Sequence, residues 1–83
     1  MTRKPIEPSD WTALSIREIL ELAIADEEET RDSYKRAAGL TGNARTRNVL
    51  LHLSAMEQDH ADSLRKELED LQLQGDMERG LAD

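Results

Sequence analysis

Apolar residues recur at steps of three and four along two stretches of the chain, which is the spacing of one face of an α-helix. In the first stretch this face comprises Ile16, Leu20, Ala23, Glu27, Thr30, Tyr34 and Ala38. In the second it comprises Leu50, Leu53, Glu57, His60, Leu64, Leu68 and Leu71. The pattern predicts two packed helices in which Glu27, Glu57 and His60 occupy positions where a core favours apolar side chains.

Signals for helix ends place the first helix from about Ile16 to Ala38. Ser15 and Glu18 have the spacing of a capping box, which satisfies backbone donors at the start of a helix. The segment from Gly39 to Gly42 would end this helix, with glycine in the left-handed conformation.

The second helix is expected to run to about Leu73, with Thr41 or Asn43 as its cap. The expected organisation is an irregular N-terminal lead over 1–14, a helical hairpin over 15–73 and a flexible C-terminal tail over 74–83. The fold class is therefore all-α.

Further apolar residues fall outside both predicted faces, namely Leu22, Ile24, Leu51 and Ala55. A lone hairpin would leave them in water, so they are interpreted as contacts between subunits. We therefore expect the hairpin to dimerise into a four-helix bundle, in keeping with the small core that so short a chain can bury.

The short turn also predicts which residues lie level with one another. Glu27 lies 15 residues before Gly42 and Glu57 lies 15 residues after it. In an antiparallel hairpin both carboxylates then stand about 22 Å from the bend. His60 is one helical turn beyond Glu57 and shares its face, so the three side chains are candidate metal ligands.

Two hairpins related by a two-fold axis would supply four glutamates and two histidines, a set that suits two divalent first-row cations such as iron or manganese. Glu57 would bridge the metals, Glu27 would bind at an outer position and His60 would cap one metal in each subunit. Tyr34, two turns from Glu27 on the same face, could donate a hydrogen bond to a ligand carboxylate.

Composition narrows the function classes. The net charge of −7, from 18 acidic and 11 basic residues, argues against nucleic-acid binding. The absence of cysteine excludes zinc–thiolate and iron–sulfur sites. No apolar run approaches the ~20 residues of a membrane span, and the first residues lack a secretion signal, so a cytoplasmic location is expected.

The residues Glu27, Tyr34 and Glu57-Gln-Asp-His60 resemble the ferritin-like superfamily, in particular the single-hairpin encapsulated ferritins of its rubrerythrin-like branch, over about residues 16–73. The resemblance implies a ferroxidase that oxidises Fe(II) at a di-iron centre between two subunits, with two ions per dimer, for iron storage or detoxification. Glu27, Glu57 and His60 would bind iron and Tyr34 would support them.

The same resemblance implies that Asp26 and Glu29 form a site where metal enters, and that dimers assemble further, for example into a decamer inside an encapsulin nanocompartment. Ser33 departs from the family pattern, and residues 75–83 match an encapsulin-docking peptide only faintly. Two alternatives stay open at this point: a rubrerythrin-like peroxidase, and a non-catalytic helical dimer with a structural metal. His52 is expected at the surface.

Overall fold

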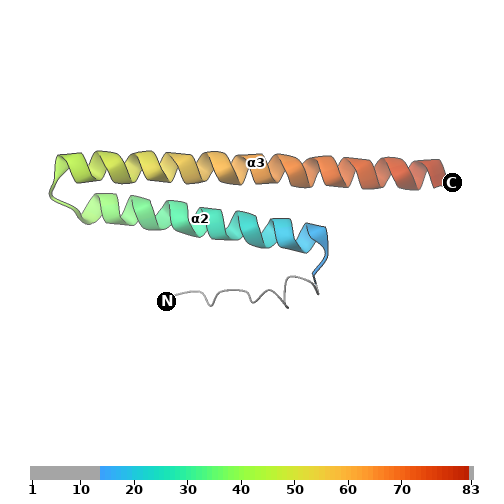
Figure 1. Cartoon of the computed structure of the whole chain (residues 1–83), viewed down its shortest axis with the longest axis horizontal. Coiled ribbons are helices and arrows are strands. Elements are labelled where there is room, and N and C mark those ends of the chain that lie inside the picture. Colours follow the sequence, from blue (N-terminus) through green and yellow to red (C-terminus); the bar gives the residue numbers. More distant parts are fainter. Residues whose placement is uncertain (1–13, 83) are drawn as a thin grey trace.

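The computed structural model describes the backbone of residues 14–82 and the side chains of residues 14–75. Two antiparallel helices form a hairpin: α2 (Ile16–Leu40) and α3 (Ala44–Ala82), shown in Figure 1. This confirms the all-α hairpin. Most of the predicted N-terminal lead, including Trp11, lies outside the described residues.

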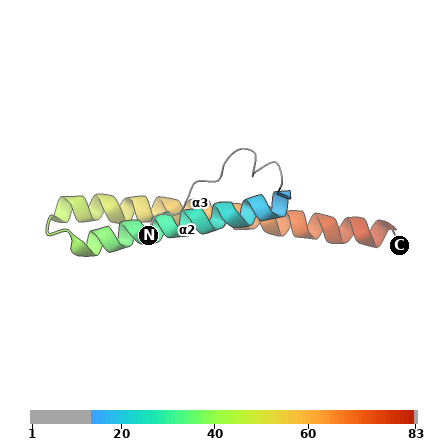
Figure 2. The ribbon, with the colours of Figure 1, turned by 90° about the horizontal axis from the view of Figure 1, so that it is seen from below.

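The two helices differ in length. At a rise of about 1.5 Å per residue, the 25 residues of α2 span roughly 38 Å and the 39 residues of α3 span roughly 58 Å. The C-terminal part of α3 therefore extends beyond the start of α2 (Figure 2). Neither helix of the described region is apolar enough over a sufficient length to cross a bilayer.

The start of α2 is the predicted capping box. The backbone N–H of Glu18 donates to Ser15 Oγ at 3.1 Å, and the backbone N–H of Ser15 donates to Glu18 Oε1 at 3.2 Å. The start of α3 is capped by Asn43, whose Oδ1 accepts from the Thr46 N–H at 2.8 Å. Both caps satisfy backbone donors that a helix start leaves unpaired.

The turn differs from the prediction in one respect. No glycine in the described region has a positive φ, so neither Gly39 nor Gly42 is a left-handed cap. The helix instead runs on to Leu40 and ends at Thr41, which is extended (φ −78°, ψ 138°) and donates its N–H to the Ala37 carbonyl at 3.1 Å. An extended cap residue reverses the chain without the left-handed conformation that glycine permits.

The predicted end of the second helix near Leu73 is wrong, because α3 continues to Ala82. Gly75 is a weak helix breaker: it costs roughly 1 kcal/mol relative to alanine but keeps its backbone donor, unlike proline. The residues before it, Leu71 to Gln74, are good helix formers. Segment 74–82 is thus helical rather than irregular.

The buried contact between the helices is rotated from the predicted faces, to which Ala38 alone of the buried residues described belongs. The residues under 9% exposed in the described region are Ile24, Ala38, Ser54 and Ala61. Ile24, interpreted from sequence as a subunit contact, is instead part of the hairpin's own core, whereas Ile16 is 63% exposed. Small side chains at Ala38, Ser54 and Ala61 allow the two backbones to approach closely, which accounts for the rotation.

Candidate metal centre

The three predicted ligands meet on the hairpin. Glu27 lies midway along α2, while Glu57 and His60 lie one turn apart on α3. Each offers one ligand atom, and these atoms all lie within 4.8 Å of one another. The turn at residues 41–43 is centred on Gly42, so the predicted equal height of Glu27 and Glu57 is confirmed. We call Glu27, Glu57 and His60 the ligand group.

Distances within the ligand group fit a shared cation better than direct hydrogen bonds. His60 Nδ1 lies 3.6 Å from Glu27 Oε2 and 3.8 Å from Glu57 Oε2. Both separations exceed ordinary hydrogen-bond lengths. Two ligand atoms that each lie about 2.1 Å from one metal ion can be at most about 4.2 Å apart, and both measured separations meet this limit.

Glu27 Oε2 is the one buried side-chain oxygen or nitrogen of the described residues without a hydrogen-bond partner. Leaving a buried carboxylate oxygen unpaired costs about 1–3 kcal/mol or more. A cation bound by the ligand group would satisfy this atom. Two carboxylates and a neutral imidazole also balance the charge of one divalent ion, so the residues present fit a metal.

The ligand group is open on one side. The side chains of Glu27 and Glu57 are 28% and 21% exposed, whereas that of His60 is 56% exposed. The three donors therefore lie at the edge of the interhelix contact and not in its centre. A cation held by these three residues could therefore take further ligands from another molecule on the open side.

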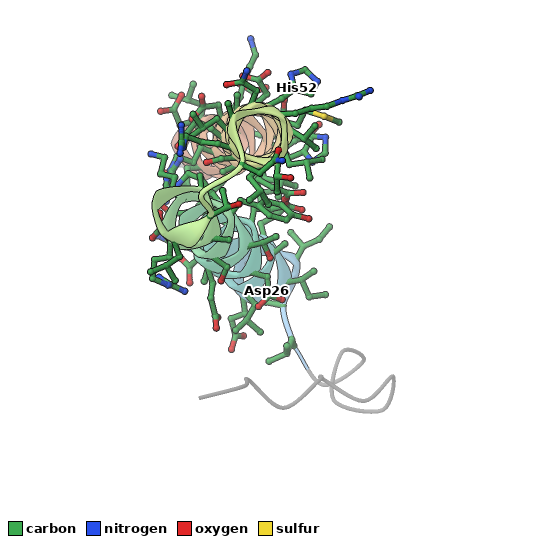
Figure 3. The ribbon with its side chains drawn as sticks, turned by 90° about the vertical axis from the view of Figure 1, so that its left-hand side faces the viewer. Asp26 and His52 are labelled. Carbon is green, nitrogen blue, oxygen red and sulfur yellow. The ribbon has the colours of Figure 1, made fainter. Side chains whose placement is uncertain are left out.

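The remaining predicted site residues are not members of the ligand group. Tyr34 is half-buried, and in the described region no hydrogen bond reaches Glu27 Oε2 from its hydroxyl. Asp26 and Glu29 are exposed, and Figure 3 shows Asp26 on the side of α2 away from α3. Their roles stay predictions. His52 is exposed on the outer side of α3, as expected (Figure 3).

A second polar cluster joins the helices and was missed from sequence. Arg65 of α3 pairs with the Glu28 carboxylate, to which Arg31 also approaches at 3.7 Å. In the sequence, Arg31 is the basic residue nearest to the acidic run 26–29. The additional pairing arises because the long Arg65 side chain reaches across from the other helix, a contact that residue spacing does not encode.

Arg31 is the centre of this cluster. Its Nε donates to Asp32 Oδ1 at 2.9 Å, and this hydrogen bond lowers the pKa of the Asp32 carboxyl and raises that of Arg31. Its NH1 donates to Gln58 Oε1 at 2.7 Å. The backbone carbonyl of Arg31 accepts from Ser54 Oγ at 3.1 Å. The seven-residue spacing of Ile24, Arg31 and Ala38 is the sequence signal that could have placed Arg31 at the interhelix contact.

Comparison with known proteins gives one match. The model of the family described as "Ferritin-like domain" matches residues 2–74. No curated protein sequence and no solved structure matches the chain.

Proposed function

Because this chain belongs to the family of ferritin-like domains, we propose that it is a ferroxidase whose substrate is Fe(II). The observation that carries the proposal is the ligand group. Two carboxylates and an imidazole converge from two helices, and one carboxylate oxygen among them is buried without a partner. Oxygen and imidazole nitrogen donors together suit iron in either oxidation state.

We propose further that two hairpins pack with their ligand groups facing each other. One hairpin offers three ligand residues on an open side, whereas first-row ions in such sites accept up to six donors. Two-fold symmetry would bring a second set of three to the same place. Glu57, the least exposed of the three, is suited to bridge the two ions.

The chemistry of this centre is electron transfer from two substrate ions to one oxidant. Each Fe(II) loses one electron; dioxygen receives two electrons and two protons and leaves as hydrogen peroxide. The carboxylates of Glu27 and Glu57 favour the product because their negative charge stabilises Fe(III) more than Fe(II). His60 would supply an imidazole nitrogen, and its Nδ1 lies 3.6 Å and 3.8 Å from the carboxylates of Glu27 and Glu57.

The proposal is tested by mixing anaerobic metal-free protein with Fe(II), admitting air, and following iron oxidation together with oxygen uptake. The expected result is oxidation faster than in buffer that saturates near one iron per chain. His60→Ala should reduce the rate to that of buffer, because it removes a ligand.

His52→Ala is the matched control, since it removes an exposed histidine of the same helix and should leave the rate unchanged. Oxidation no faster than in buffer would overturn the ferroxidase proposal. Metal binding without oxygen uptake would favour a structural metal, and repeated peroxide turnover with an added electron donor would favour a peroxidase.

A further inference from the structure

Ser54 makes a directional link between the helices close to the ligand group. Its side chain is 2% exposed, and it is the one polar residue among the buried residues of the described region. Ser54 Oγ donates to the backbone carbonyl of Arg31 at 3.1 Å, from α3 to α2. A buried hydroxyl with its hydrogen bond satisfied adds geometric specificity that an alanine at this position would lack.

The side chain of Arg31 makes a second contact with α3. Arg31 NH1 donates to Gln58 Oε1 at 2.7 Å. Ser54 and Gln58 lie three residues before and one residue after Glu57, so the two contacts bracket this ligand. On α2, Arg31 lies four residues after Glu27, one helical turn away.

Besides Ser54, the buried residues of the described region are Ile24, Ala38 and Ala61, which are apolar, and the Arg65–Glu28 pair adds one more polar link between the helices. Burial of apolar area is itself non-directional, so at these residues only the close fit of the side chains resists a small axial slide. Hydrogen bonds weaken steeply with distance and angle. The hydrogen bonds of Ser54 and Gln58 therefore oppose sliding of one helix along the other.

Such a slide would affect metal binding directly. Glu27 stands on one helix, whereas Glu57 and His60 stand on the other. A shift of about 1 Å along the axis would move Glu27 relative to the other two by several times the tolerance of roughly 0.2 Å that metal–ligand distances allow. Fixing the axial register is thus a condition for binding one ion by donors from both helices.

We propose that Ser54 and Gln58, acting on Arg31, are positioning residues that hold Glu27 level with Glu57 and His60 for metal binding. This inference rests on the proposed metal site. It assigns a function to a buried serine, an arginine and a glutamine that lie outside the ligand group.

The test compares Ser54→Ala with Ser63→Ala, which makes the same change at an exposed serine of α3. Gln58→Ala removes the other contact from a side chain that is not buried in the core, so it tests the idea independently of any packing loss at Ser54. For each anaerobic protein, Co(II) binding is titrated by calorimetry and unfolding of the metal-free form is measured in urea.

We expect Ser54→Ala and Gln58→Ala to weaken Co(II) binding by about tenfold, the lower end of the effect of residues that orient metal ligands. The KM for Fe(II) should rise in parallel, and Ser63→Ala should change neither value. Unchanged affinity in Ser54→Ala and Gln58→Ala, with lowered resistance to urea, would show that these residues only pack and would overturn the inference. Failure of the unmodified protein to bind Co(II) would instead overturn the metal site.

Discussion

Glu27 is the residue at which stability and function conflict most directly. Its Oε2 atom is buried without a hydrogen-bond donor, and its carboxylate lies close to the carboxylate of Glu57. Both features are unfavourable in the metal-free protein, because an oxygen buried without a hydrogen-bond donor costs free energy and like charges repel. A bound cation would offset both costs, as expected if these carboxylates serve to bind metal.

This conflict predicts opposite effects of Glu27→Leu on the metal-free and metal-bound forms. The metal-free protein should gain about 1 kcal/mol in unfolding free energy, since the substitution removes an unsatisfied acceptor. The stabilisation that Co(II) adds to the unmodified protein should disappear, because a ligand is lost. Urea unfolding with and without Co(II) measures both quantities.

Glu67→Leu supplies the control, because Glu67 is an exposed glutamate of α3 outside the ligand group. This control should retain the stabilisation by Co(II). A metal-free Glu27→Leu protein that is clearly less stable than the unmodified one would contradict the interpretation and assign Glu27 a structural role.

At the scale of elements, α3 is the longer helix and includes two glycines, Gly75 and Gly80. Gly75 lies inside the helix, and a Cβ atom added there would meet nothing within 4 Å. Neither a close contact nor an unusual backbone conformation therefore requires glycine at position 75. Its effect is confined to the entropy that glycine loses on entering a helix.

The substitution Gly75→Ala should accordingly raise helix content and stabilise the protein by roughly 0.5–1 kcal/mol. Gly75→Pro should have the opposite effect, since proline removes a backbone donor and clashes with the preceding turn. Far-UV circular dichroism and urea unfolding report both changes. Equal helix content in the two variants would show that the chain around residue 75 is not helical in solution.

At the scale of the whole molecule, the hairpin buries few side chains and leaves many apolar ones in contact with solvent. The large exposed apolar residues of the described region are Ile16, Leu40, Val49, Leu51, Met56 and Leu73. Val49 and Met56 belong to the same face as His60, because positions 49, 53, 56 and 60 are separated by steps of four, three and four. The open side of the ligand group is thus bordered by apolar surface suited to a second hairpin.

This arrangement predicts that Val49→Glu abolishes self-association and metal-dependent oxidation together. A buried charge without a partner would be placed in the proposed interface. Leu51→Glu is the comparison, because Leu51, which the sequence also assigns to a subunit contact, lies two residues from Val49 and hence on a different side of α3. Sedimentation of the metal-free and Fe(II)-loaded proteins checks the prediction.

A monomeric unmodified protein that still oxidises iron would contradict the two-subunit centre. Equal dissociation by Val49→Glu and Leu51→Glu would show that the copies meet through another face, or through more than one.

The sequence by itself determined the two helices, the turn between them and the three residues that meet at the ligand group. These follow from local rules, because helix periodicity and equal distance from a short turn can be counted along one chain. Asn43 and Ser15 likewise act on neighbouring residues, so their caps could be predicted.

Only the tertiary structure decided how each helix is rotated about its own axis. That rotation buries Ile24 and Ser54, leaves His60 at the open edge, and brings Arg65 to Glu28. Its cause is the close fit of small residues from both helices, together with the reach of long side chains, and both depend on residues far apart in sequence. Packing therefore determines the contacts between the helices that local sequence rules do not specify.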